Sequence, residues 1–163
     1  CDNFLEGFGG HPMAAGLTIN EEKLDNFIDN FENICTEKLD LNALTPKIFI
    51  DCEIKLNEIN SRMINFLKYL EPFGPQNAKP KFLSRNVHVD GIPKLLGKDQ
   101  STIKFNIKQK GSLFEAIGFK MINEYEKLIK NVPIDVVYHI SENHFNGKIS
   151  LQLEIKEIRY SNV

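Results

Sequence analysis

Hydrophobic and polar residues alternate along most of the second half of the chain, as they do in strands with one buried face. The clearest case is 102–108, where apolar residues occupy every second position and lysine or asparagine lies between them. Similar patterns predict strands over 82–92, 113–119, 134–140 and 149–158, and Asn146-Gly147 is a typical hairpin turn. Three- to four-residue spacing over 122–130 predicts a short helix instead. We therefore expect three strands, a helix and two further strands.

That order is the layout of an oligonucleotide-binding (OB) barrel, in which a helix lies between the third and fourth of five strands. OB barrels contact their ligands with strands two and three and with the loops after strands one and four. A generic five-stranded sandwich is the alternative, and the position of the helix favours the barrel.

The first part of the chain has a different pattern. Residues 17–19 predict a short strand, Asn20 is a suitable helix N-cap, and an apolar stripe from Leu24 to Leu39 predicts a helix of about five turns. One strand and one helix cannot bury such a stripe. We therefore expect residues 1–45 to be the end of an α/β domain whose beginning is missing, and the first residue, Cys1, also suggests an excised piece.

A linker connects this region to the barrel. Residues 47–55 alternate and predict a half-buried strand whose inner positions are Ile48, Ile50, Cys52 and Ile54. A short helix is expected next, starting at Asn57 or Asn60. The proline-containing segment 72–80 then ends the helix and continues as an extended loop. Residues 46–163 would thus form the linker and the barrel domain, and the fold class is α+β.

Composition narrows the setting of the protein. The 163 residues are 42% hydrophobic and 26% charged, and no apolar run is long enough to cross a bilayer, so we expect no membrane contact. The three cysteines, at positions 1, 35 and 52, form no C-x-x-C pair, which argues against a disulfide framework or a zinc site. Cys35 and Cys52 are expected to be buried free thiols, as is typical of a cytoplasmic protein.

Charged residues are unevenly distributed along the chain, although the net charge is only −2. Residues 1–78 contain six Lys or Arg against thirteen Asp or Glu, residues 79–110 eight against two, and residues 111–163 six against seven. A basic block of this kind indicates a local surface for a polyanion, although a solvated lysine-rich face would give the same count.

The basic residues coincide with the ligand-binding parts of the expected barrel. The candidate nucleic-acid contacts lie in three places. Lys94 and Lys98 are in the loop after the first strand, and Lys104 and Lys108 are on the second strand, with Lys110 in the turn beyond it. His144, Phe145 and Lys148 are in the 141–148 loop after the fourth strand. Lysines would meet phosphates, and Phe145, His144 or Phe114 would offer flat surfaces for bases.

A second candidate site lies near the start of the chain, in Phe8-Gly9-Gly10-His11-Pro12-Met13-Ala14-Ala15-Gly16. Glycines at positive φ would let Gly9 and Gly10 direct backbone N–H groups at an anion, and His11 could donate to a phosphate. The alternative is a glycine turn with an idle histidine.

The whole string resembles the GGHxxAAG signature of the DHH-associated domain of RecJ-type nucleases, which are single-strand-specific exonucleases of the DHH phosphoesterase superfamily. Three later segments resemble the same family in the same order: LEPFGPQNAKP (70–80), FEAIGFKM (114–121) and NGKISLQLEIKEIR (146–159). The resemblance covers essentially the whole chain. It departs from the family at Ala78, where proline is common.

The resemblance implies 5′-to-3′ exonuclease action on single-stranded DNA in recombination and repair, with Mn²⁺ or Mg²⁺ bound by the DHH domain. In the family, His11 would lie beside the scissile phosphate. No Asp-His-His occurs in this chain and its four histidines stand apart, so we expect no metal ligands and no cleavage by this chain alone. His88 and His139 fall within strand patterns and are expected to be structural.

Two other functions remain open. The barrel could be a docking module for a protein such as a single-strand-binding protein, whose acidic tail would also suit the lysines. The chain could instead belong to a related DHH phosphodiesterase acting on nano-RNA, although the barrel argues against that. In either case we expect a monomer.

Overall fold

The computed structural model describes residues 1–40, 44–145 and 147–161. It divides into two compact units, Cys1–Ile48 and Phe49–Val163, and each is described by itself.

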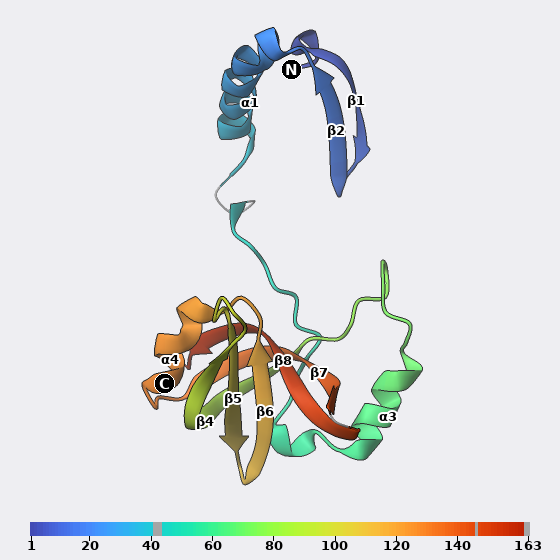
Figure 1. Ribbon diagram of the computed structural model, residues 1–163. Coiled ribbons are helices and arrows are strands. Elements are labelled where there is room, and N and C mark those ends of the chain that lie inside the picture. Colours follow the sequence, from blue (N-terminus) through green and yellow to red (C-terminus); the bar gives the residue numbers. More distant parts are fainter. Residues whose placement is uncertain (41–43, 146, 162–163) are drawn as a thin grey trace. The chain divides into compact units, whose positions relative to one another are not determined.

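Residues 1–40 of unit 1 form an antiparallel hairpin followed by a helix (Figure 1). A 3₁₀ turn, η1 (Asp2–Phe4), leads into β1 (Leu5–His11), which pairs with β2 (Ala14–Ile19). A second 3₁₀ turn, η2 (Glu21–Lys23), continues into α1 (Leu24–Lys38). The side chain of Asn20 accepts a hydrogen bond from Glu22 N at 3.0 Å, so the expected N-cap forms.

The glycine-rich stretch is a strand rather than the loop that its composition suggests. Gly9 pairs with Gly16 and Gly10 with Ala15, and neither Gly9 nor Gly10 has a positive φ. At Gly10 a Cβ atom would lie 2.6 Å from the carbonyl oxygen of Ala14, so glycine is needed there for close approach of the second strand. The prediction of a positive-φ cradle is therefore wrong.

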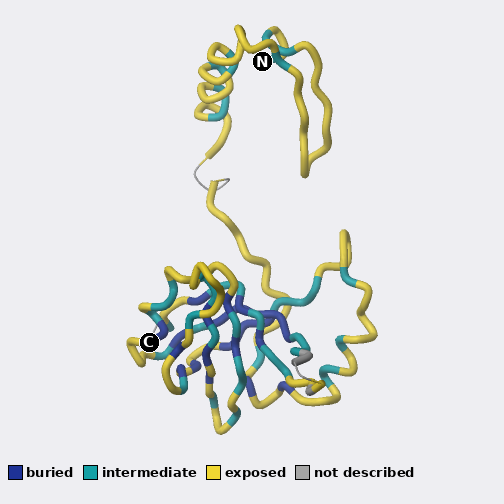
Figure 2. The backbone as a smooth tube through the Cα atoms, in the orientation of Figure 1, coloured by how far each residue is buried: buried dark blue, intermediate teal, exposed yellow. Residues whose placement is uncertain are grey.

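Apolar surface of unit 1 is left open: no residue of 1–40 is buried (Figure 2). Phe8 is 71% exposed, and Ile28 and Phe31 of α1 are 42% and 50% exposed. The apolar stripe predicted for the helix exists, and its Phe27, Phe31 and Ile34 line an open hollow together with residues of the hairpin.

Unit 2 is a barrel with a short preceding segment. In chain order its elements are β3 (Cys52–Glu53), η3 (Leu56–Glu58), α3 (Ser61–Tyr69), β4 (Phe82–Leu96), β5 (Thr102–Gln109), β6 (Ser112–Gly118), η4 (Ile122–Glu124), α4 (Tyr125–Ile129), β7 (Ile134–Phe145) and β8 (Lys148–Tyr160). The sheet order is β3-β4-β5-β6-β8-β7, and pairing of β4 with β7 closes the barrel. Five long strands with α4 between the third and fourth confirm the predicted OB layout.

The core of unit 2 is formed by the inward positions of the barrel strands, which alternate with exposed ones as the sequence predicts (Figure 2). Ile103, Ile107 and Leu153 are fully buried, and Leu56 of η3 joins them. One polar pair lies inside: the Tyr138 hydroxyl is 2.8 Å from Ser84 Oγ. Because Ser84 Oγ donates to the carbonyl oxygen of Ile54 at 2.7 Å, Tyr138 supplies the proton of the shared bond.

The predicted linker strand is shorter and more exposed than expected. Only Cys52 and Glu53 pair, in parallel with the start of β4, while Ile48 and Ile50 remain exposed and Ile54 alone is partly buried. The alternation failed as a guide because only residues 51–54 bond along the start of β4, and residues 48–50 have no strand partner among the described residues. Cys52 is therefore an exposed thiol, not a buried one, and Cys35 is half-buried.

The fourth barrel strand is longer than the sequence predicts. β7 and β8 stay paired out to Phe145 and Lys148, so the segment 141–148 that was expected to be a loop is mostly hairpin. Polar residues from Ser141 on interrupt the alternation, yet the backbone ladder does not depend on side-chain polarity. Asn146, in the predicted turn, lies outside the described residues.

Within the described ranges, no helix is both long enough and apolar enough to span a membrane.

Candidate nucleic-acid interface

The candidate lysines of the barrel share the outer face of β4 and β5. Antiparallel pairing sets Lys94 opposite Lys104 and His88 opposite Lys108, with Asp90 and Asn106 between these two pairs. Because inward residues alternate with outward ones, the backbone directs these side chains away from the core. Three of the predicted basic residues thus lie on one side of the barrel.

The two lysines at the centre of this face already form ion pairs with carboxylates. Lys104 Nζ is 2.8 Å from Glu115 Oε2 on β6, and Lys108 Nζ is 2.6 Å from Asp90 Oδ1 on β4. Glu115 is held further by Gln152, whose Nε2 donates to Oε1 at 2.6 Å. The centre of the face is therefore close to neutral, which the count of lysines in 79–110 did not indicate.

The cations that remain open lie toward the ends of the face. Lys98 belongs to the 97–101 loop between β4 and β5, and Lys110 forms the β5–β6 turn with φ of 48°. Both are exposed, as is Lys94. Among the described residues these three lysines make no ion pair. They can meet phosphates without first losing a carboxylate.

An exposed aromatic residue that the sequence analysis did not select directly follows β6. Phe119 is 56% exposed, and it continues the outward positions of β6 beyond Glu115 and Ile117. The last outward position of the period-two pattern over 113–119 is Phe119, so the sequence pattern could have identified it. Phe114, which was considered as a stacking residue, is instead partly buried against the core, so that interpretation is wrong.

The third group of candidates lies at the β7–β8 hairpin. Its backbone pairs His144 with Ile149 and Phe145 with Lys148. The side chains of His144, Phe145 and Lys148 lie outside the described residues, so their part in an interface stays a prediction.

The two strand histidines differ. His139 is 9% exposed, its Nδ1 is 2.7 Å from the carbonyl oxygen of Pro80, and burial lowers its pKa, as expected of a structural histidine. His88 is exposed on the same face as Lys108, so its assignment as structural is wrong.

In unit 1, His11 ends β1 at the two-residue hairpin turn and is exposed. Its Nδ1 accepts a hydrogen bond from Met13 N at 3.2 Å, so a neutral imidazole carries its proton on Nε2. The space where a side chain of Gly9 would lie is open, whereas the facing strand fills the corresponding space at Gly10. Beside them lies a hollow of about 830 Å³ lined largely by apolar residues, including Phe8, Phe27 and Phe31.

No group of three or more His, Cys, Asp or Glu side chains able to hold a metal ion occurs among the described residues. The described part of the chain therefore holds no donor set that fits the Mn²⁺ or Mg²⁺ of the complete enzyme implied by the resemblance.

A closed five-stranded barrel with a helix before its fourth strand is an OB fold. The RecJ OB domain model matches residues 50–157, and the DHHA1 domain model matches residues 1–37. The chain belongs to the RecJ family.

Individual relatives agree. The chain is 29% identical to the single-stranded-DNA-specific exonuclease RecJ of Bacillus subtilis over 99% of its length, and 30% identical to that of Haemophilus influenzae over 96%. It spans 20% and 27% of those two proteins. A crystal structure of RecJ in complex with Mn²⁺ from Thermus thermophilus shares the fold over 99% of the chain, with a TM-score of 0.75, 21% identity and 23% of that chain covered.

Proposed function

We propose that unit 2 binds single-stranded DNA along the outer face of β4, β5 and β6, as a monomer, and positions the strand for a RecJ-type 5′-to-3′ exonuclease of recombination and repair. The observation that carries the proposal is the register that aligns Lys94 with Lys104 and His88 with Lys108 on one face of an OB barrel. The relatives named as single-stranded-DNA-specific exonucleases support the same substrate class.

In this proposal phosphates and bases have different partners. Lys94 and Lys98 take phosphates directly, while Lys104 and Lys108 exchange a carboxylate for a phosphate when the strand arrives. Phe119 offers a ring on which a base can stack, a contact that carries about 1–3 kcal/mol per base in single-strand-binding proteins. Single-strand selectivity follows because a paired base cannot present its flat face.

The test is binding of a labelled oligo(dT) and of the matching duplex, followed by fluorescence anisotropy across a salt series. Each phosphate contact contributes about 0.7 to the slope of log K against log salt for a single strand. Replacing Lys94 and Lys98 with Gln should lower the slope by about 1.4. A matched variant with Lys68 and Lys130 replaced should keep the original slope. Equal affinity for strand and duplex would contradict the proposal.

His11 has a separate role in the proposal. Its Nε2–H is free to donate to the scissile phosphate in the complete enzyme, because the backbone N–H of Met13 already occupies Nδ1. A bound Mn²⁺ or Mg²⁺ supplies an activated water and charge neutralisation in metal-dependent phosphodiester hydrolysis. Because the described residues hold no metal-ligand cluster, we propose that the metal ligands come from outside this chain. We therefore expect no hydrolysis by the chain with Mn²⁺, and cleavage by the purified chain would overturn this.

A docking role for an acidic protein tail, such as that of a single-strand-binding protein, remains the second candidate. The exposed side chains of Leu113 and Phe119 beside lysines would suit a peptide that is both acidic and apolar. Competition between such a peptide and oligo(dT) separates the two functions, since a docking site would hold the peptide at salt concentrations that release the DNA. RecJ family membership favours either role over a nano-RNA phosphodiesterase.

A further inference from the structure

A basic groove lies beside the barrel at the opposite end of the β4–β5 ladder from Lys98. It has a volume of about 450 Å³. Its walls are formed by the end of β3 with the two residues after it, by the part of β4 that begins its pairing with β5, and by the β5–β6 turn. Its lining comprises Glu53, Ile54, Lys55, Arg85, Asn86, His88, Gln109 and Lys110. Of these residues the sequence analysis selected only Lys110.

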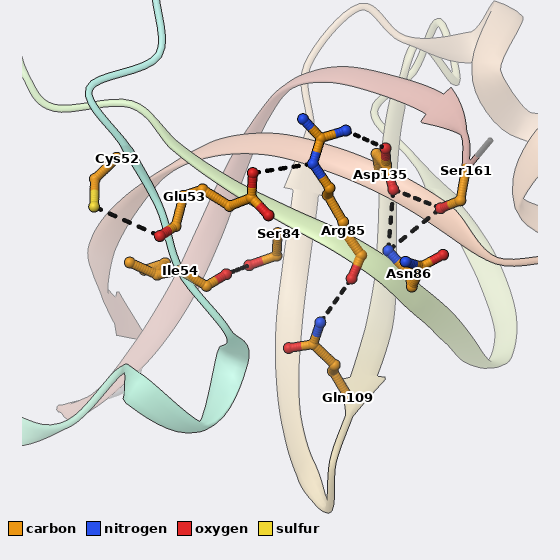
Figure 3. Close-up of polar contacts among 9 residues, drawn as sticks. All are labelled: Cys52, Glu53, Ile54, Ser84, Arg85, Asn86, Gln109, Asp135 and Ser161. Atoms are coloured by element: carbon orange, nitrogen blue, oxygen red, sulfur yellow. Dashed lines mark hydrogen bonds and ion pairs between the residues drawn. The ribbon is translucent and has the colours of Figure 1, made fainter. Parts of the chain in front are cut away.

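The wall of the groove is held in place by a polar network (Figure 3). Arg85 Nε is 3.0 Å from Glu53 Oε2, and its Nη1 is 3.2 Å from Asp135 Oδ2. Gln109 joins two segments, because its Nε2 donates to the Arg85 carbonyl oxygen at 2.6 Å and its Oε1 accepts from Leu56 N at 2.8 Å. The linker is thereby fixed against β4 and β5, and the groove is formed before any ligand arrives.

The balance of charge in the groove favours an anion. Lys55 and Lys110 are exposed, and among the described residues neither makes an ion pair. His88 is exposed and also lines the groove. Glu53 is the acidic residue of the lining, and it shares Arg85 with Asp135, so the open positive charge comes from Lys55 and Lys110. Two open cations and an imidazole around a small hollow suit phosphate oxygens.

The groove also continues the proposed DNA path. His88 is in register with Lys108, and Lys110 follows Lys108 by two residues, in the turn after the same strand. Six residue steps separate Lys104 from Lys110, which corresponds to about 20 Å of extended chain. A strand lying along the face therefore reaches the groove without turning back.

We propose that this groove binds phosphates of a single-stranded DNA that has already crossed the barrel face, with Lys55, His88 and Lys110 as its contacts. The inference rests on the proposed function and deepens it. It makes the binding site longer than the OB face, toward the upper part of the roughly 4–16 nucleotides that OB folds occupy. Affinity should therefore keep rising with oligonucleotide length after the face itself is covered.

The test measures the affinity of the 163-residue chain for oligo(dT) of increasing length. In the variant carrying Lys55→Gln and Lys110→Gln, affinity should stop rising at a shorter length, and the salt slope for long oligonucleotides should fall by about 1.4. Short oligonucleotides should bind as tightly as to the unchanged chain. Replacing Lys68 and Lys130 with Gln removes the same charge elsewhere and should leave the length dependence intact. Thermal melting of each variant verifies that it is folded.

Four outcomes separate the possibilities. Loss confined to long oligonucleotides supports the groove, whereas equal loss at every length assigns the two lysines to the face and overturns it. No loss at any length also overturns the groove while leaving face binding intact. Failure of the unchanged chain to bind any oligonucleotide rejects the proposed function itself.

Free phosphate is the other source of the same chemistry. The ring signals of His88, followed by NMR at constant ionic strength, should move further with a long oligonucleotide than with a short one, because only the long one also enters the groove. Saturation of the shift by micromolar inorganic phosphate would assign the groove to a free anion and overturn the strand path.

Discussion

Removing two carboxylates from the barrel face should strengthen DNA binding. Asp90 and Glu115 neutralise Lys108 and Lys104 in the free protein, and a bound phosphate must compete with them. The Lys104 and Glu115 side chains are 37% and 31% exposed, so the dielectric constant of bulk water gives a lower limit to the interaction energy. At about 6 Å, a carboxylate and a phosphate then repel by about 0.7 kcal/mol.

Releasing the lysine adds a few tenths of a kcal/mol, the usual worth of an exposed ion pair. Each substitution, Asp90→Asn or Glu115→Gln, should therefore tighten binding by about 1 kcal/mol, or about fivefold, and the double variant by about 25-fold. Its salt slope should change little, because Lys104 and Lys108 meet phosphates in both proteins.

Anisotropy with labelled oligo(dT) over a salt series measures both quantities. A variant with Glu32→Gln and Glu37→Gln on α1 changes the net charge equally and tests whether the gain is local. If the Asp90/Glu115 double variant binds no more tightly than the unchanged chain while its melting temperature is preserved, the DNA does not cross this face and the reasoning fails.

Three further predictions follow from single side chains. Replacing Phe119 with Ala should weaken oligonucleotide binding by about 1–3 kcal/mol with little change in melting temperature, whereas Phe114→Ala should chiefly lower the melting temperature because that ring packs on the core. Tyr138→Phe leaves the buried Ser84 hydroxyl without its donor and should cost about 1–2 kcal/mol in urea unfolding; an unchanged midpoint would mean that the shared bond is not formed. Burial holds the folded-state pKa of His139 below its ordinary 6.5, so the unfolded chain binds the proton more readily. The stability contribution is complete above pH 6.5 and falls on acidification below it, and melting curves from pH 7.5 to 5 should show this loss in the unchanged chain and a smaller one in His139→Gln.

The barrel could be predicted from the sequence because its strands have one buried face each. From 102 to 119 the period-two alternation translates directly into Ile103 and Ile107 inside and Lys104 outside. The same rule failed at Ile48 and Ile50, where alternation exists without a partner surface to bury it. Periodicity reports amphipathic character, and burial requires a neighbour as well.

The candidate interface was only half visible in the sequence. Lysine content located the basic block, but Asp90 and Glu115 neutralise its centre, and Glu115 comes from outside the 79–110 block. Such pairs depend on strand register, which the sequence does not give. The basic groove was missed for the same reason, since Lys55 and Lys110 are 55 residues apart in sequence and meet only through the linker.

The short linker element has a consequence for where the barrel unit begins as a folding unit. Leu56 is fully buried and Ile59 nearly so, and the side chain of Glu53 engages Arg85 on β4. A truncated protein starting at the first long strand would open a hole beneath the sheet and leave Arg85 without one of its anchors. The smallest autonomous OB module of this chain must therefore start at or before Asp51, some thirty residues ahead of Phe82.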